Sequence, residues 1–128
     1  EALDYYKRSL EINIDVEDNL GMAASINNIG AVYLHKGSID KALYYFKRSL
    51  KIYEKIDDKR EMGGSLQNIG MIYHDKADYD KTLDYYARAL KIFEEFDDQD
   101  QKIIEEEMEN FINEATAFYD REVERYQD

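Results

Sequence analysis

The same helical segment is written three times in this chain at a spacing of 40 residues. Residues 1–12 read EALDYYKRSLEI, residues 41–52 read KALYYFKRSLKI and residues 81–92 read KTLDYYARALKI. The first two copies are identical at 8 of 12 positions and the last two at 7 of 12. The segments between them, 21–40 and 61–80, agree at 8 of 20 positions under the same shift. A fixed period of this length predicts stacked repeats, which form an open solenoid rather than a closed globule.

Apolar residues predict two helices in every 40-residue unit. In residues 39–53 they recur three, four and seven positions apart, as one side of a helix requires. We call the first helix of a unit helix A and the second helix B. The expected helices are two A helices at about 20–36 and 60–76, and three B helices at about 1–13, 39–55 and 79–95.

These helices define the domain organisation that we expect. A half repeat at 1–15 and full repeats at 18–56 and 58–96 form an array over residues 1–98, followed by a terminal helix at 99–128. The expected fold class is all-α, a right-handed superhelix of antiparallel helix hairpins.

Short polar residues mark where the helices begin. The expected N-caps are Asp18, Asp58 and Asp98 before the A-type helices, and Ser38 and Asp78 before the B helices. Their side-chain oxygens can accept the free backbone N–H groups of a first helical turn. Gly37 can adopt the left-handed conformation that ends a helix, whereas Ala77 at the equivalent place cannot do so without cost. We therefore expect a strained or altered turn at Ala77.

The last part of the chain departs from the repeat and is strongly acidic. Residues 94–128 hold 14 acidic and 3 basic residues, whereas residues 1–93 hold 15 acidic and 14 basic residues. One helical side of this segment is apolar, with Ile104, Met108, Phe111, Ala115 and Phe118. This pattern predicts a capping helix that is apolar toward the last repeat and charged toward water. The alternative is an acidic tail that recruits a basic partner.

The composition excludes several classes of function. Cysteine is absent, which excludes disulfides within these residues and agrees with a reducing compartment, so we expect a cytoplasmic protein. No apolar run of about 18 residues occurs, and no basic surface could neutralise phosphates, so we expect neither a membrane nor a nucleic-acid partner. Catalytic and phosphate-binding motifs are absent, and His35 and His74 lack nearby ligand partners, so we expect no enzyme activity, metal or cofactor. Because the chain opens at Glu1 within a repeat, we expect it to be a fragment.

Small and large residues recur together in the two complete units. They are Ile29, Gly30, Tyr33, Gly37, Ala42, Phe46 and Ser49 in the first, and Ile69, Gly70, Tyr73, Ala77, Thr82, Tyr86 and Ala89 in the second. This pattern resembles the tetratricopeptide repeat, in a longer form similar to the repeats of kinesin light chains, Pins-type polarity adaptors and bacterial peptide sensors. The two glycines would let helix B approach helix A closely. Thr82 and Ala77 depart from the pattern and are expected to loosen the second unit slightly.

The resemblance implies that helix A lines the inner, concave wall of the solenoid. The implied peptide-binding residues are Asn27, Asn28, Ala31, Leu34 and His35 in the first unit, and Gln67, Asn68, Met71 and His74 in the second. Asn28 and Asn68 lie one period apart, and a primary amide can donate and accept hydrogen bonds together, as peptide backbone requires. In the related repeats, Asn at this place holds peptide backbone. The alternative is that these amides only bridge neighbouring helices.

We therefore expect a non-catalytic protein-interaction module that binds an extended or partly helical peptide in its concave groove. Two further hypotheses stay open. The helix at 1–13 lacks an A partner, so Leu3, Tyr6, Leu10 and Ile12 would be partly exposed and could pair two copies as a homodimer. Alternatively, the repeats sense a signal for an effector domain outside this chain.

Overall fold

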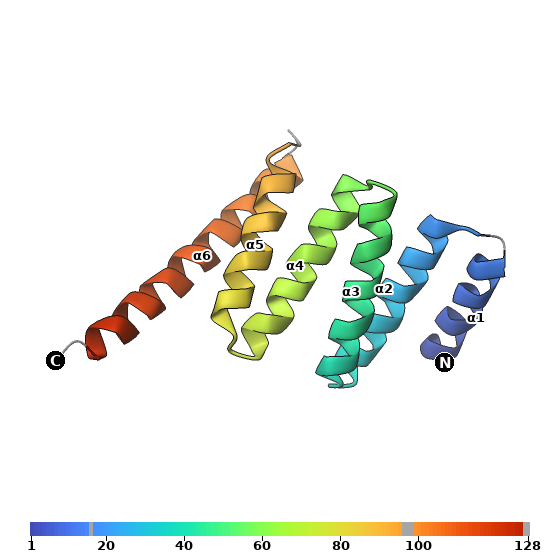
Figure 1. The fold of residues 1–128 in the computed structure, drawn as a ribbon, viewed down its shortest axis with the longest axis horizontal. Coiled ribbons are helices and arrows are strands. Elements are labelled where there is room, and N and C mark those ends of the chain that lie inside the picture. Colours follow the sequence, from blue (N-terminus) through green and yellow to red (C-terminus); the bar gives the residue numbers. More distant parts are fainter. Residues whose placement is uncertain (16, 96–98, 127–128) are drawn as a thin grey trace.

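The structure is a row of helices in which each helix lies beside the next (Figure 1). This computed structural model describes residues 1–15, 17–95 and 99–126, apart from the side chains of residues 15, 99–101, 104 and 107. The helices are α1 (Ala2–Asp15), α2 (Asn19–His35), α3 (Ile39–Lys55), α4 (Lys59–Asp75), α5 (Tyr79–Phe93) and α6 (Gln99–Arg125). Their bounds match the expected ones to within about two residues for α1 to α5. The predicted all-α solenoid of antiparallel hairpins is confirmed.

Contacts between helices follow the order of the chain. The most extensive ones lie within the hairpins α2–α3 and α4–α5, and smaller ones join α1 to α2, α3 to α4, and α5 to α6. Among the described residues, no backbone approach joins helices that are not consecutive. This nearest-neighbour arrangement is the one that a short repeat produces when every unit buries its apolar side only against the next.

Aspartates begin three of the helices as expected. The carboxylate of Asp18 accepts a hydrogen bond from the backbone N–H of Gly21 at 2.9 Å, ahead of α2. Asp58 does the same for Glu61 ahead of α4, and Asp78 for Lys81 ahead of α5, each at 3.3 Å. Ser38 occupies the N-cap position of α3, but its side chain makes no capping hydrogen bond, so that part of the prediction is wrong. Asp98 lies outside the described residues.

One residue with positive φ recurs every 20 residues between α1 and α5, each time just before a helix N-cap position. The residues with positive φ are Glu17 at 54°, Gly37 at 80°, Asp57 at 55° and Ala77 at 60°. After Gly37 and Ala77 the next N–H donates back to a tyrosine carbonyl five residues earlier, at 2.9 Å in both hairpins. Ala77 therefore adopts the same left-handed turn as Gly37 although its Cβ disfavours that conformation, by roughly 1 kcal/mol. The strain expected at this turn is real, and the turn geometry is unchanged.

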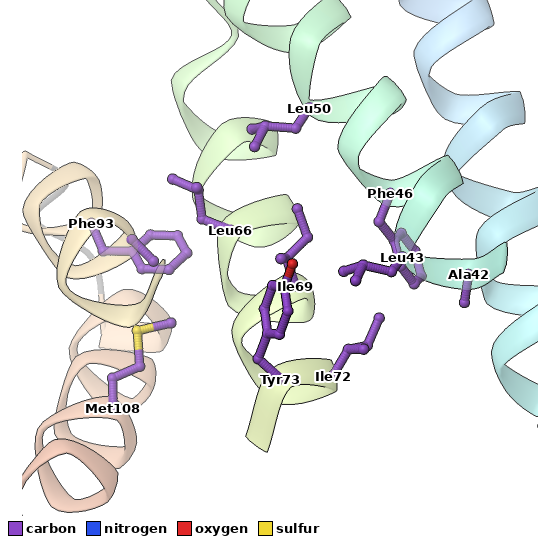
Figure 2. Packing of buried hydrophobic residues seen from close by; sticks show 11 residues of the cluster. Ala42, Leu43, Phe46, Leu50, Leu66, Ile69, Ile72, Tyr73, Phe93 and Met108 are labelled. Carbon is purple, nitrogen blue, oxygen red and sulfur yellow. The ribbon is translucent and has the colours of Figure 1, made fainter. Parts of the chain in front are cut away.

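The core lies along the boundary between the two hairpins and continues into α6 (Figure 2). Figure 2 shows Leu66 and Ile69 of α4 between the apolar side chains of α3 and the ring of Phe93 on α5. Met108 of α6 lies next to Phe93, and both are 2% exposed. One continuous apolar cluster thus runs through α3, α4, α5 and α6, and its burial stabilises the stacking of each of these helices on the next.

Glycine allows close packing inside each hairpin. A Cβ built on Gly30 would lie 3.2 Å from the ring of Phe46, and one built on Gly70 would lie 2.5 Å from the ring of Tyr86. Both rings come from the B helix of the same hairpin. The role of these glycines in bringing helix B close to helix A is therefore confirmed, and the second hairpin is the tighter of the two at this point.

Helix α6 stays straight where the earlier units turn back. With the 40-residue shift, Glu122 stands where Ala42 and Thr82 are fully buried, and Phe118 stands where Ser38 and Asp78 begin a B helix. A charged side chain cannot occupy that buried position without a partner, and Phe does not cap a helix. A further helix B is therefore disfavoured, and α6 continues to Arg125 and diverges from α5 toward its C-terminal end (Figure 1).

The apolar side of α6 is only partly covered. Met108 and Ala115 are buried, Phe111 is half-buried, and Phe118 is 38% exposed. Ile104, which was expected on the same side, has a side chain outside the described set. Helix α6 thus covers the last repeat at its centre and leaves apolar surface accessible at its edge.

At the opposite end of the solenoid, α1 packs part of its apolar surface against α2. Leu3, Tyr6 and Leu10 are half-buried, which agrees with the partial exposure expected for them. Tyr5 and Ile12 are the larger exposed residues of α1, at 67% and 62%. They lie seven residues apart and so occupy one side of the helix, away from the half-buried set.

Candidate functional site

The candidate residues of the first unit lie along α2 and differ in accessibility. Asn28 and Ala31 are half-buried, Leu34 is 39% exposed, and His35 is exposed at the end of the helix. Ala24, one turn before Asn28, is exposed as well. Helix α2 therefore presents an accessible strip of small, amide and aliphatic groups, which is suited to contact with a chain lying across it.

Asn27 differs from its neighbour Asn28. Its side chain is half-buried, and its Oδ1 atom is buried without a hydrogen-bond partner among the described residues. A buried acceptor without a partner costs about 1–3 kcal/mol, so this amide is poorly satisfied. Because the oxygen is enclosed, it is not an accessible acceptor for a ligand in this conformation.

The candidate residues of the second unit, on α4, are divided between open surface and the junction with α6. Asn68 is exposed, and a Cβ built on Gly64, one turn earlier, would meet nothing within 4 Å. The Asn68 amide therefore has free space beside it. Gln67, Met71 and His74 instead lie where side chains of α6 approach α4.

Phe111 of α6 is the centre of that junction. Its ring lies 4.6 Å from the ring of His74 and 4.9 Å from the ring of Tyr86, in both cases edge to face. Such pairs contribute about 0.5–1.5 kcal/mol beyond their buried area. Further along α6, Phe118 lies 5.1 Å from Tyr79 of α5. Aromatic side chains thus fix α6 to the second hairpin at two places.

Two small pockets flank Phe111. One, of about 180 Å³, is lined by Gln67, Met71, Tyr86, Met108 and Phe111. The other, of about 160 Å³, is lined by His74, Tyr79, Phe111, Glu114, Ala115 and Phe118. Their walls are mainly apolar and aromatic, and each is of a size to admit one side chain. Pockets of this kind accept apolar anchors rather than a complete small-molecule cofactor.

The electrostatic setting of the junction is acidic. Asp75 lies beside His74, with 3.7 Å between the carboxylate and Nδ1, and exposed Glu114 forms part of one pocket wall. Burial, and secondly the nearby charge of Asp75, raise the pKa of Tyr86 to about 12. Tyr86 therefore stays neutral at physiological pH and acts as an apolar wall with a polar tip.

Sequence reasoning placed the walls of these pockets only in part. Phe111 and Phe118 were expected to face the last repeat, which they do, but they were not expected to form a groove with helix A. Tyr86 belongs to the repeat pattern, which gives no indication that it borders a pocket. The spacing of Phe111 and Phe118, seven residues apart on one side of α6, was the available signal.

Across the described ranges, no group of three or more His, Cys, Asp or Glu side chains is placed to hold a metal ion. Over the same part of the chain, no helix combines the length and the apolar character needed to cross a bilayer. The accessible strips of α2 and α4 and the junction with α6 are the candidate binding surfaces of the described residues.

Comparisons with known proteins agree with this architecture. Residues 1–55 match the family described as tetratricopeptide repeat, and residues 72–128 match a domain of unknown function (DUF8828). The fold is similar to the crystal structure of BtubC (BKLC) from P. vanneervenii, with a TM-score of 0.69 and 18% sequence identity. That similarity covers 93% of this chain and 53% of the other, so this chain spans about half the length of the solved structure. No curated protein matches the chain.

The 40-residue period, the close-packed glycines and the repeated turns fit the family match over residues 1–55, and the solenoid extends the same construction through α5. On these grounds residues 1–55 are of the tetratricopeptide repeat type, and the helices up to the end of α5 continue the same repeat architecture.

Proposed function

We propose that this chain is a non-catalytic interaction module that holds an extended or partly helical peptide against the A helices α2 and α4. The tetratricopeptide repeat family suggests a protein–protein interaction module, and its fold is typically non-catalytic. The finer proposal, a peptide held along the A helices, is supported by the accessible strip that the two helices repeat. In this proposal residues 1–98 form the binding array and residues 99–128 its terminal cap.

One observation carries the proposal. Asn28 and Asn68 occupy the same place in successive units, and each follows a small residue one turn earlier, Ala24 or Gly64, that leaves space beside the amide. A primary amide offers one acceptor and two donors, so two such amides one repeat apart can pair with the backbone of a peptide that lies across both helices.

Aliphatic side chains supply the rest of the contact. Leu34 is 39% exposed and Met71 is 50% exposed, on α2 and α4 respectively. An unbranched Met adapts to different partner side chains, so Met71 suits a surface that accepts more than one sequence. The amides would set the direction of the peptide backbone, and the aliphatic groups would add affinity.

The test is a peptide-display selection against the chain, followed by affinity measurements on the selected peptides. The double variant Asn28→Ala and Asn68→Ala should weaken binding about tenfold, because two hydrogen bonds worth about 0.5–1.5 kcal/mol each are lost. Asn113→Ala, an exposed amide on α6, is the matched control and should leave the affinity unchanged. The proposal fails if no selected peptide distinguishes the double variant from the control.

A second candidate function is self-association through α1. Tyr5 and Ile12 are exposed on one side of this helix at 67% and 62%, and no described residue covers them. Two copies could bury these side chains against each other. Sedimentation at increasing concentration should then show a dimer that Ile12→Ser abolishes. A monomer at all concentrations would exclude this function and leave peptide binding untouched.

A further inference from the structure

The junction between α4 and α6 is built differently from the contacts between consecutive helices. Within the described residues, the backbone of α6 approaches α5 but not α4, and α4 meets α6 only through side chains. The ring of Phe111 bridges this gap, 4.6 Å from His74 on α4. Because the backbones stand apart, the space on either side of Phe111 is left as the two pockets of about 180 Å³ and 160 Å³. We call this pair of pockets the Phe111 groove.

Accessible apolar groups form the rim of the Phe111 groove. Met71 on one side is 50% exposed, and Phe118 on the other is 38% exposed. The floor contains the buried side chains Met108 and Ala115. Two neighbouring apolar pockets separated by one aromatic ring suit two apolar anchors that lie close together, as on one side of an amphipathic helix.

The α6 wall of the groove belongs to an acidic segment of the chain. Glu114 is exposed in the wall of one pocket, and residues 94–128 hold 14 acidic against 3 basic residues. Of those basic residues, Arg125 already pairs with Glu122 at 3.4 Å. An approaching segment with lysine or arginine between its apolar anchors would therefore be attracted, and an acidic one would be repelled.

We propose that the Phe111 groove binds a basic amphipathic segment of a partner protein, with two apolar anchors in the pockets and basic side chains toward the acidic residues of α6. This proposal rests on the peptide-binding role proposed above and assigns it a second contact area and a class of partner. Met71 belongs to both areas, so a peptide could extend from the amides of α2 and α4 into the groove.

The probe is a short fluorescent peptide of leucine and lysine with leucine at helical spacing, titrated against the intact chain by anisotropy. Met71→Ser and Phe118→Ser should each weaken its binding about fivefold, since each removes one apolar contact of a pocket rim. Ile103→Ser is the matched control, because Ile103 is 50% exposed on the same helix but lines neither pocket. Glu114→Gln should weaken binding less and reduce its salt dependence, whereas Glu124→Gln should not.

Circular dichroism and thermal melting of each variant show whether the fold is kept. This is expected because Met71 is 50% exposed, and because Met108 and Phe111 still hold α6 on the second hairpin when Phe118 is truncated. Equal binding of the probe to all variants, or equal binding of a leucine and glutamate peptide, would overturn the proposal. Loss of binding only in the Asn28→Ala, Asn68→Ala double variant would overturn it as well, while the proposed function would stand. Self-association of the free chain that Met71→Ser abolishes would assign the groove to a second copy instead.

Discussion

The hairpins α2–α3 and α4–α5 are close copies that have different neighbours. In each, the tyrosine near the end of helix A stacks on a tyrosine of helix B, Tyr33 on Tyr45 at 5.5 Å and Tyr73 on Tyr85 at 5.6 Å. A lysine lies over the first ring of each pair, at 5.4 Å and 5.0 Å. These repeated contacts occur where one helix meets the other inside the hairpin, and they are the same whatever follows the hairpin in the chain.

The hairpins differ in the surface that meets α6 and in one turn. Phe46 in the first hairpin is Tyr86 in the second, and Tyr86 contacts Phe111 of α6. Gly37 is replaced by Ala77 in the turn, and the approach of Gly70 to its aromatic partner is closer than that of Gly30. Positions that are the same in both hairpins therefore hold helix A against helix B. Positions that differ affect how the second hairpin contacts α6.

The largest difference should come from adding a methyl group at the close approach. Gly70→Ala would place a Cβ at 2.5 Å from the Tyr86 ring, and we expect it to reduce the free energy of unfolding by about 2 kcal/mol. Gly30→Ala meets Phe46 at 3.2 Å, and the gain in helix propensity should keep the net change below about 1 kcal/mol. Urea denaturation measures both.

Gly64→Ala is the control for the propensity gain on the same helix, because its Cβ would meet nothing within 4 Å. It should stabilise the chain by about 0.5–1 kcal/mol. If Gly30→Ala costs as much as Gly70→Ala, the second hairpin is not the tighter one, and the comparison of the two fails at this point.

The second largest effect should be a loss of stability at alkaline pH that comes from the second hairpin. Burial raises the folded-state pKa of Tyr86 to about 12, above the unfolded value of about 10. Its contribution to stability is therefore complete below about pH 10 and is lost as the pH rises through about 12. The expected loss is about 1–2 kcal/mol by pH 11.5, since a shift of one pKa unit corresponds to about 1.4 kcal/mol.

Tyr86→Phe gives the second hairpin the residue that the first one has at Phe46. It should remove the loss of unfolding free energy that ionisation of Tyr86 causes at alkaline pH. Urea denaturation at about pH 9 and pH 11.5 provides the measurement, and Tyr44→Phe, whose ring is 57% exposed, is the control. An unchanged pH dependence in Tyr86→Phe would show that Tyr86 is not held in a water-excluding environment.

Exchanging the turn residues should produce a smaller effect of opposite sign in the two hairpins. Gly37 and Ala77 have φ values of 80° and 60°, a region that a Cβ disfavours. We expect Gly37→Ala to destabilise by about 1 kcal/mol and Ala77→Gly to stabilise by about 0.5–1 kcal/mol. Thermal melting of the single and double exchanges tests this, and a destabilising Ala77→Gly would contradict it.

The smallest effect concerns the surface ion pair between the hairpins. Lys76 at the end of α4 contacts Asp40 at the start of α3 at 2.7 Å, and this contact lowers the pKa of Asp40 and raises that of Lys76. Lys76→Met should return the pKa of Asp40 toward its usual value, which carboxyl NMR titration can follow. Because the Asp40 pKa is depressed, its small contribution is present above about pH 4 and lost as the pH falls through the folded value.

The sequence was sufficient for the fold because its signals recur. Asp18, Asp58 and Asp78 act locally as caps, and Ile29 and Ile69 are buried at 1% and 0% exposure because the same apolar spacing was repeated. Local hydrogen bonding and helical period do not depend on distant contacts, so they can be inferred from neighbouring residues.

The candidate site was less predictable because it depends on how α6 crosses the second hairpin. Gln67, Met71 and His74 were expected on an open wall, but the side chains of Met108 and Phe111 reach them. The sequence of α6 is not a copy of an earlier repeat. The 40-residue period therefore does not predict how α6 crosses the second hairpin. The burial of the Asn27 Oδ1 atom is a second feature that the sequence did not predict. It depends on how neighbouring helices pack around this side chain, and the apolar spacing of α2 alone does not determine that packing.

Within the described residues no backbone approach joins helices that are not consecutive, so the two ends of the solenoid are linked only through the helices between them. Small hinge rotations at successive interfaces therefore add up, and the chain has the elasticity of units joined in series. The interface between α5 and α6 is the least extensive of these joints, so it should be the most compliant and the first to open under mechanical load. Tension applied to the two ends would consequently widen the space beside Phe111 before it separated either hairpin.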